Sequence, residues 1–541
     1  MSELPKGWLS IELENFVYIA GRIGWRGLKR SEYTDSGAAF LAVKNILPNG
    51  NIAFNDIEHI SQERYDESPE IQLKENDIIL TKDGTIGKIG MVSYLPFPTT
   101  VNSSLLVVRP CNLILPRFLF YYLRGPQFQT IARERITGSA VPHLFQKDIK
   151  KLVAVVPPLN EQRRIVAKLE KLLAKVDTCK ERLDKIPGIL KRFRQSVLSA
   201  ACSGRLTADW RENNPDVESA EELLKRIQKQ IDKRYDEECK KAQKEGRREP
   251  RDQRKNKKSR NTPVELIDVP SSWAIVRLED ISYLVSDGTH KTPKYQTEGK
   301  PFLSVKNVRP FVVKDADIKF ISEEEFQEIN NRCNPEIGDI LYTKVGATFG
   351  YAAINKLNYP FSIFVSLALI KPVHPYFSSE YAEIVINSEI VFSQARERVS
   401  GIGTPDLHLI EIRDFRIPLP PLAEQLEIVN RVQTLFKTAD QIEQRYQKAR
   451  TYIDQLTQSI LAKAFRGELV PQDPNDEPAS VLLERIRAER ENRENVAKTA
   501  KKPAANKKQR SKKAQPPLEP TPQLEPKPEL EPIQLELPLF E

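Results

Sequence analysis

The chain contains one sequence pattern twice, and the two copies lie about 263 residues apart. Pro-Pro-Leu-Asn-Glu-Gln at residues 157–162 returns as Pro-Pro-Leu-Ala-Glu-Gln at residues 420–425. Upstream, Phe-Leu-Ala-Val-Lys-Asn at residues 40–45 matches Phe-Leu-Ser-Val-Lys-Asn at residues 302–307. Solenoid repeats recur every ~20–50 residues, so copies this far apart are two half-proteins. Such a chain can offer two similar surfaces to a ligand that is itself repeated.

Composition narrows the class of protein. The chain has 541 residues, of which 40% are hydrophobic and 29% charged, so it can form two to four domains that each bury a core. It has no apolar run of about 18 residues and no secretory signal at its start, so we expect a cytoplasmic protein without membrane contact. The five cysteines form no Cys-x-x-Cys motif, which argues against disulfide frameworks and structural metal sites.

The net charge of +9 is concentrated in two segments. Residues 231–260 hold thirteen Lys/Arg and seven Asp/Glu, and residues 498–513 hold eight basic residues and no acid. The rest of the chain is therefore net acidic. A nucleic-acid surface on the folded body must be a local patch, while the two basic segments either add attraction to phosphates or serve as solvated linkers.

Two stretches carry apolar residues at steps of four and three, which is the spacing of a coiled-coil seam. The stepped positions are Ile165, Leu169, Leu172, Val176, Cys179, Leu183, Ile186, Leu190, Phe193 and Val197, then Ile428, Val432, Leu435, Ala439, Ile442, Tyr446, Ala449, Ile453, Leu456 and Ile460. We expect two long helices that bury these seams against each other. Pro187 should interrupt the first helix only, and Gly204 and Gly467 are natural stops.

The rest of the chain divides around these helices. Short β-like runs separated by Gly and Pro predict a strand-rich half on each side of the repeat. The expected segments are a first half at 1–156, a helix at 157–204, a charged and partly helical linker at 205–262, a second half at 263–419, a helix at 420–467, a short helical segment at 468–497, and a basic then Pro/Glu-rich tail at 498–541. The last 26 residues hold eight prolines, so we expect that part to be disordered.

Motifs for catalysis are absent from the sequence. The Gly-Lys pair at residues 87–88 lacks the spacing and the following Ser/Thr of a phosphate loop. Val-Pro-Pro-Leu at residues 156–159 is not the motif of an amino-methyltransferase, and no Gly-rich cofactor loop precedes it. None of the five histidines sits in a zinc-protease or triad-like context. We therefore expect neither an enzyme nor a bound metal.

A globular half, Pro-Pro-Leu-x-Glu-Gln, a long heptad helix, Gln-Ser-Val/Ile-Leu and Gly-Arg/Glu-Leu follow one another twice. This succession resembles the specificity subunit of a type I restriction-modification system, over nearly all of residues 1–497. The resemblance implies an α+β fold with an internal pseudo-two-fold repeat. In it, two mixed, strand-rich target-recognition domains are joined by two long helices that form an antiparallel coiled coil.

In that family each target-recognition domain reads one half of a split sequence in double-stranded DNA. The helices act as a spacer and dock two modification subunits, which methylate adenine with S-adenosylmethionine. Restriction subunits complete the nuclease-translocase, for which ATP and Mg²⁺ are implied. The resemblance thus implies a non-catalytic subunit that binds none of these cofactors itself. The residues alone also leave open a coiled-coil scaffold whose globular halves bind protein partners.

Loops with small polar and basic residues after predicted strands are the candidates for DNA contact, against ordinary turn chemistry as the alternative. In the first half they are Lys44, Asn45, Lys82, Gly84, Thr85, Lys88, Ser139 and His143; in the second they are Thr289, His290, Lys291, Lys306, Asn307, Lys344, Thr348, Tyr351, Thr404 and Asp406. The Lys-Asn pairs recur in both halves, which suggests phosphate anchoring or a structural role. His143 and Asp406 align but differ, as reading two different half-sequences would require.

Contacts to the modification subunits are assigned by resemblance alone. They are placed on the exposed faces of the two long helices and on the residues at which each helix begins, Glu161, Gln162, Glu424 and Gln425.

Overall fold

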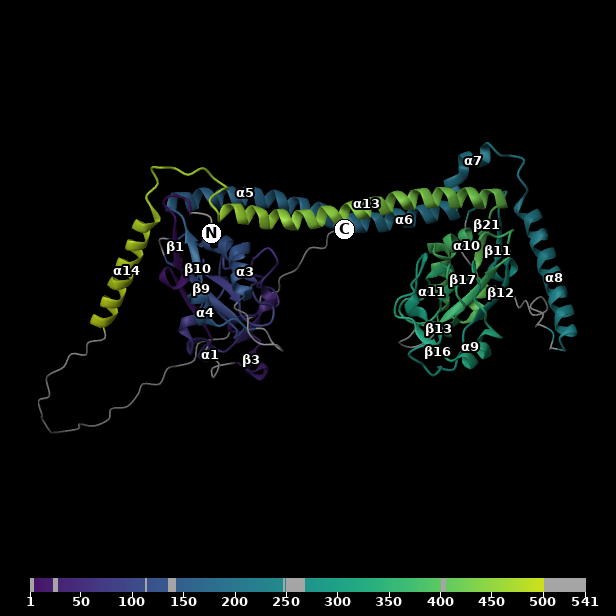
Figure 1. The fold of residues 1–541 in the computed structure, drawn as a ribbon, viewed down its shortest axis with the longest axis horizontal. Helices are drawn as coiled ribbons and strands as arrows, with labels where there is room; N and C mark the ends of the chain where they lie inside the picture. The colour runs from purple at the N-terminus through teal and green to yellow at the C-terminus, as the bar shows by residue number, and fades with distance from the viewer. Residues whose placement is uncertain are drawn as a thin grey trace, which may run out of the picture. The chain divides into compact units, whose positions relative to one another are not determined.

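The computed structural model describes residues 4–22, 28–111, 114–134, 143–246, 249, 268–399 and 405–500 (Figure 1). Residues 247–248 and 250–260 of the basic segment at 231–260, and the tail from residue 501, lie outside the described residues. Internal contacts divide the chain into two compact units. The first comprises residues 1–120, 132–162 and those from 473 onward, and the second comprises residues 121–131 and 163–472.

Both halves are strand-rich, as predicted. The first half contains β1 (Leu9–Glu12), β2 (Val17–Gly21), β3 (Tyr33–Thr34), β4 (Ala38–Leu41), β5 (Glu58–Ile60), β6 (Ile78–Thr81), β7 (Ile89–Met91), β8 (Thr99–Val101), β9 (Leu105–Pro110) and β10 (Val153–Val156), with α1 (Gln62–Asp66), α2 (Pro116–Arg124), α3 (Pro126–Glu134) and α4 (Gln146–Lys150). The second half contains β11 (Ala274–Arg277), β12 (Ser282–Asp287), β13 (Lys300–Leu303), β14 (Val308–Arg309), β15 (Val312–Val313), β16 (Lys319–Ile321), β17 (Ile340–Thr343), β18 (Ala352–Ile354), β19 (Ser362–Ile363), β20 (Leu367–Pro372) and β21 (Arg416–Leu419), with α9 (Glu323–Asn330), α10 (Ser379–Ile386), α11 (Glu389–Arg398) and α12 (Leu409–Arg413).

Two sheets of the first half have strand-for-strand counterparts in the second. The order β2-β9-β6-β7 in the first half corresponds to β12-β20-β17-β18 in the second, and the pair β1-β10 corresponds to β11-β21. The register repeats as well, because Thr81 faces Leu105 and Thr343 faces Leu367. In the central strands β6 and β17 every residue is buried, so both faces of each strand are covered and the strand ends are held in fixed places.

The long helices are α5 (Leu159–Asp184), α6 (Ile186–Cys202) and α13 (Leu422–Ala464). Pro187 lies in the first turn of α6, where a proline is tolerated, and the break falls between α5 and α6. The second helix runs without interruption (Figure 1). Gly204 and Gly467 follow the helix ends with φ of 75° and 78°, a conformation that glycine adopts readily. All three expectations are confirmed.

Ion pairs show that α5 and α6 run antiparallel to α13. Lys180 pairs with Asp454 at 3.0 Å, and Arg194 pairs with Asp440 at 2.7 Å and with Glu443 at 2.8 Å. From one pair to the next, the residue numbers rise on the first helix and fall on the second, so the helices run in opposite directions. The seam of the first repeat therefore packs on the seam of the second, as the resemblance implied.

The prediction that every seam residue is core is wrong in part. Ile165, Leu169 and Ile428 are fully buried, but Phe193 and Ile442 are 37% and 43% exposed, and Cys179 is exposed as well. In a pair of helices each seam residue is covered by one partner helix only, so some seam positions stay partly open to solvent.

Two shorter helices dock on equivalent places of the two halves. In α8 (Ala220–Lys244) the N–H of Ala220 donates to the carbonyl of Ser272 at 3.1 Å, and in α14 (Ala479–Ala500) the N–H of Ala479 donates to the carbonyl of Gly7 at 2.9 Å. The apolar residues Leu223, Ile227, Leu482 and Ile486 of these helices are buried. Helices predicted in the linker and after the second long helix are thus confirmed, and each covers one half-protein. No helix within the described ranges is long and apolar enough to cross a membrane.

We expect the substitution Ile428→Ala to lower the free energy of unfolding by about 2–5 kcal/mol, because it leaves a cavity at a fully buried seam position. Ile442→Ala, on the same helix but 43% exposed, should change it by about 0.5 kcal/mol or less. Urea denaturation followed by circular dichroism compares the two. Equal losses would contradict this description of the seam.

Candidate nucleic-acid interface

The candidate loops of the two halves are closed by the same kind of hydrogen bond, to a threonine hydroxyl at the end of a strand. Thr81 ends β6, and its hydroxyl accepts a hydrogen bond from the N–H of Lys88 at 2.9 Å. Thr343 ends β17, and its hydroxyl accepts one from the N–H of Tyr351 at 2.8 Å. Each hydroxyl therefore closes the loop that follows its strand. The loop of the second half is one residue longer.

The closed loops present their tips to solvent. Gly84 has φ of 68° and open space where a side chain would stand, and Thr85 beside it is exposed. In the second half Gly346 has φ of 90° and also faces open space. Thr348 supplies the carbonyl that accepts the hydroxyl of Thr343 at 2.7 Å, so its backbone shapes the loop. Glycines at the tips leave room for another backbone or a phosphate to approach closely.

In the first half the loop is tied to two neighbouring segments. His143 forms an isolated β-bridge with Asp83, and its ring Nδ1 contacts the Asp83 carboxylate. The ammonium of Lys88 donates to the carbonyl of Val43 at 3.3 Å, and Lys82 Nζ lies 4.0 Å from Asp83. The structure thus brings Lys82, Lys88 and His143 together around one loop.

The equivalent position in the second half carries a different charge arrangement. Asp406 forms the bridge to Val345 that His143 forms to Asp83. Its partner is Lys344, whose Nζ lies 3.6 Å from the carboxylates of both Asp406 and Asp287. The acid lies in the loop in the first half and on the bridging segment in the second, while Lys82 and Lys344 occupy the same position of the two loops.

Asp287 is a charge centre that the sequence did not reveal. It ends β12 with its side chain 3% exposed, and Arg332 Nη2 lies 2.6 Å from its carboxylate. His290 Nε2 lies 3.4 Å away, and Lys344 completes the group. Nothing in the spacing of the sequence links Arg332, which follows α9, to this site. The contact arises only when the sheets pack.

The prediction that Lys344 is a surface residue in contact with DNA is wrong, because its side chain lies inside the protein. Its side chain is 5% exposed and held between two carboxylates. Its role in the described structure is therefore to fix Asp287 and Asp406. Tyr351 is half-buried at the end of the same loop. His290, with a side chain 63% exposed, and Lys291, also exposed, remain at the surface.

Thr289 anchors this surface. Its N–H donates to the carbonyl of Ile363 at 3.1 Å, and its hydroxyl accepts from the N–H of Lys291 at 3.2 Å. A cavity of about 200 Å³ opens beside it, lined in part by Asp287, Lys291 and Arg332. Gly288 must be glycine there, because a Cβ would stand 1.9 Å from the Ile363 carbonyl oxygen.

The Lys-Asn pairs split into a structural and an exposed residue. Asn45 and Asn307 are 3% and 4% exposed. Their side-chain oxygens accept from backbone N–H groups at 3.0 Å, and their amides donate to the carbonyls of Ala53 and of Lys314. Both asparagines therefore hold a turn together, and the assignment of DNA contact to them is corrected.

The lysines of these pairs are exposed. Lys44 pairs with Asp56 and Glu58 at 3.3 and 3.5 Å, so part of its charge is already compensated. Lys306 is exposed on the matching turn. Ser139 and Thr404 lie outside the described residues.

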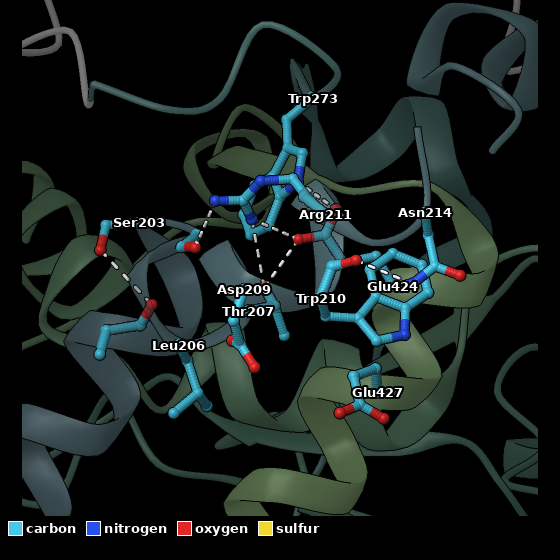
Figure 2. Close-up of polar contacts among 12 residues, drawn as sticks. Ser203, Leu206, Thr207, Asp209, Trp210, Arg211, Asn214, Trp273, Glu424 and Glu427 are labelled. Atoms are coloured by element: carbon cyan, nitrogen blue, oxygen red, sulfur yellow. Dashed lines mark hydrogen bonds and ion pairs between the residues drawn. The ribbon is translucent and has the colours of Figure 1, made fainter. Parts of the chain in front are cut away.

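The residues assigned to partner contacts are buried instead. Glu161, Gln162, Glu424 and Gln425 are at most 1% exposed. The indole N–H of Trp8 donates to Glu161 at 2.9 Å, and that of Trp273 donates to Glu424 at 2.8 Å (Figure 2).

The glutamines complete the same structure. The Gln162 side-chain oxygen accepts from the N–H of Leu115 at 3.1 Å, and that of Gln425 accepts from the N–H of Ser378 at 3.0 Å. The Glu-Gln pair of each repeat thus fastens the start of a long helix to its own globular half. The assignment of partner contacts to these four residues is therefore corrected.

We expect Asn45→Ala to lower the free energy of unfolding by about 1–3 kcal/mol, because the partly buried N–H of Ala42 and carbonyl of Ala53 lose the buried side chain that they bond. Lys44→Ala at the neighbouring exposed position should lower it much less, because exposed ion pairs contribute little to stability. Thermal unfolding of both variants provides the measurement. A larger loss for the lysine variant would contradict the assignment of the structural role to the asparagine.

The comparisons with known proteins agree with this arrangement. The family described as "Type I restriction modification DNA specificity domain" matches residues 5–187 and 270–450, once in each repeat. The specificity subunit of the type I restriction enzyme EcoKI from Escherichia coli K12 is 27% identical, over 90% of this chain and 96% of its own. That of EcoDI from Escherichia coli is 30% identical, over 71% of this chain and 78% of its own.

A solved chain described as the "structural basis underlying complex assembly and conformational transition of the type I R-M system" is also similar. It aligns with a TM-score of 0.59 and 18% identity, covering 86% of this chain and all of its own. This likeness confirms the fold. Because the family match spans both repeats and most of the described structure, the chain belongs to the DNA specificity subunits of type I restriction-modification systems, whose role is recognition rather than catalysis.

Proposed function

We propose that this chain reads a bipartite sequence in double-stranded DNA, one half-sequence with each globular half. The supporting observation is the pair of loops after β6 and β17. Equivalent threonine hydroxyls close them, yet the bridged pair is Asp83 with His143 in one half and Val345 with Asp406 in the other. The same scaffold with different donors and acceptors is what two different half-sequences need.

In this proposal the exposed side chains near the loops face the duplex. Thr85 and His143 in the first half, and His290 and Lys291 in the second, are at least partly exposed. Lys44 and Lys306 lie on matching turns and would contact phosphates. Phosphate contacts hold the register of a protein on DNA, while contacts to base edges select the sequence. Affinity should therefore fall as salt rises.

We assign the recruitment of two modification subunits to the coiled coil. Ile189, Phe193 and Ile442 are 51%, 37% and 43% exposed. Arg194 pairs with Asp440 and Glu443, so these apolar side chains occupy the same stretch of the antiparallel pair. We call them the coil belt. Apolar side chains that stay exposed on paired helices are typical of a surface that binds another protein.

The proposal places all chemistry on partner subunits. The modification subunits would carry S-adenosylmethionine, and the restriction subunits would use ATP and Mg²⁺. No group of three or more metal-ligating side chains occurs among the residues that the structure describes. The isolated chain should transfer no methyl group from S-adenosylmethionine to DNA, and transfer by this chain alone would contradict the proposal.

Exchange of one globular half tests the bipartite reading. Residues 1–156 are replaced by the matching half of a relative, while Leu9, Ile11 and Val156 are kept because they line the groove beside Ala479 and Leu482 of α14. We expect one half of the methylated motif to change and the other to persist. Sequencing of methylated adenines in cells that hold the complete complex gives the result.

The reciprocal exchange of residues 268–419 is the matched control and should change only the other half-sequence. If both half-sequences change in either exchange, the two globular halves do not read independently.

Charge placed on the coil belt tests the docking surface. Phe193→Glu together with Ile442→Glu should weaken binding of the modification subunit by about tenfold or more, because it buries two charges in an apolar contact. Tyr94→Glu, at a side chain 58% exposed in the first half, is the control. Calorimetric titration with purified modification subunit measures both. Unchanged affinity for the double variant would move the contact elsewhere.

A further inference from the structure

A three-way junction of the second unit joins the end of the first helix, the start of the second helix and the second globular half. Glu424, in the first turn of α13, is 1% exposed in its side chain. Its carboxylate accepts from the Trp273 indole at 2.8 Å and from the Thr207 hydroxyl at 2.7 Å. Arg211 also donates to it. Figure 2 shows these donors, which come from two segments of the chain, converging on the carboxylate that a third segment, α13, provides.

Arg211 is itself held in place by contacts to two further residues. Its Nη2 donates to the carbonyl of Gly204 at 2.6 Å, and its guanidinium lies 5.8 Å from the centre of the Trp273 ring. Gly204 leaves no spare room, because a Cβ there would stand 2.4 Å from Pro270 Cγ and 3.0 Å from Arg211 Nη1. A buried carboxylate with three donors is rigid, because loss of any donor leaves buried charge uncompensated.

A second contact lies about two turns away along α13, at Arg431. Arg431 donates to both carboxylate oxygens of Asp209 at 2.6 and 3.0 Å, and to the carbonyl of Leu206 at 2.9 Å. Asp209 begins the first turn of α7 (Ala208–Glu212). The segment that follows the first helix is therefore fastened to the second helix at two points, by Arg211 through Glu424 and by Asp209 through Arg431.

The core beneath the junction is continuous. Val197, Leu198 and Ala201 of α6 belong to the same buried cluster as Trp273, Val276 and strand residues of the second half. Apolar packing of this kind is not directional. Hydrogen bonds are directional, so those of Glu424 set the angle between the paired helices and the second half.

We propose that Arg211 and Glu424 are positioning residues for the number of base pairs between the two half-sequences. The inference rests on the proposed bipartite reading. If the helices separate two reading surfaces, a change of angle at this junction moves the second surface along the duplex. Discrimination between the native gap and a gap one base pair longer or shorter then depends on the Glu424 contacts, while the choice of bases in each half-sequence does not.

The test uses the complete complex of this chain with its modification subunits, on duplexes that differ only in gap length. Arg211→Met should reduce the preference for the native gap by about tenfold or more, the effect of one charge-assisted hydrogen bond expressed as a ratio of rates. Arg211→Lys keeps the charge and should restore part of the preference. Arg485→Met, which removes the exposed ion pair with Glu477 instead, should leave it unchanged.

Thr207→Val provides a milder variant should Arg211→Met fail to assemble, since it removes one donor and keeps the guanidinium. A positive control lengthens both helices by one heptad, after Glu181 and after Tyr452, which the pairs Lys180–Asp454 and Asp184–Arg450 place side by side. Seven residues add about 10 Å at ~1.5 Å each. That length corresponds to about three base pairs at ~3.4 Å per base pair.

The behaviour of the wild-type complex distinguishes a failure of the proposed function from a failure of this inference. If the wild-type complex methylates without a bipartite motif, the proposed function fails. If the wild type prefers one gap, and Arg211→Met and Thr207→Val keep that preference while losing thermal stability, the junction is structural only and the inference is overturned.

Discussion

The apolar seam between α5 and α6 on one side and α13 on the other is the constraint on which the second unit depends. Each helix alone would expose a row of branched and aromatic side chains, so neither is stable without the other. Their antiparallel direction follows from ion pairs such as Arg194 with Asp440 and Glu443. Because the direction is fixed, the end of the first repeat meets the start of the second, and the Arg211 junction can form there.

The buried carboxylates of Glu161 and Glu424 show how a helix is joined to a globular half without a flexible hinge. Each accepts the indole N–H of a tryptophan that opens its own half. A buried charge is tolerated only with its donors in place, so the contact is made fully or not at all. Burial raises the pKa of Tyr381, which packs nearby, well above its ordinary value, with Glu424 as a lesser cause.

The candidate DNA surface depends on the contrast between a repeated scaffold and unrepeated side chains. Thr81 and Thr343 close equivalent loops, while the bridged pair Asp83 and His143 of the first half is Val345 and Asp406 in the second. A repeated backbone keeps both surfaces in the same relation to their sheets. Differences confined to a few side chains then alter what each surface can bind without altering the fold.

Much of the fold could be predicted from the sequence because it depends on local patterns. The heptad steps predicted the paired helices, Pro187 predicted the one break, and Gly204 and Gly467 predicted the ends. The repeat itself predicted two equivalent strand-rich halves, and the sheet registers confirm it. These signals lie within a few residues of the structure they encode.

The tertiary structure alone decided which polar residues face inward. Glu161, Gln162, Glu424 and Gln425 read as exposed partner contacts in the sequence and proved to be buried fasteners. Lys344 proved to be internal. Asp287 and Arg332 form a charge centre that the spacing of residues in the sequence does not predict. A charged residue carries no local sign of its burial, because its environment is made by segments that are distant in the chain and meet only when the sheets and helices pack.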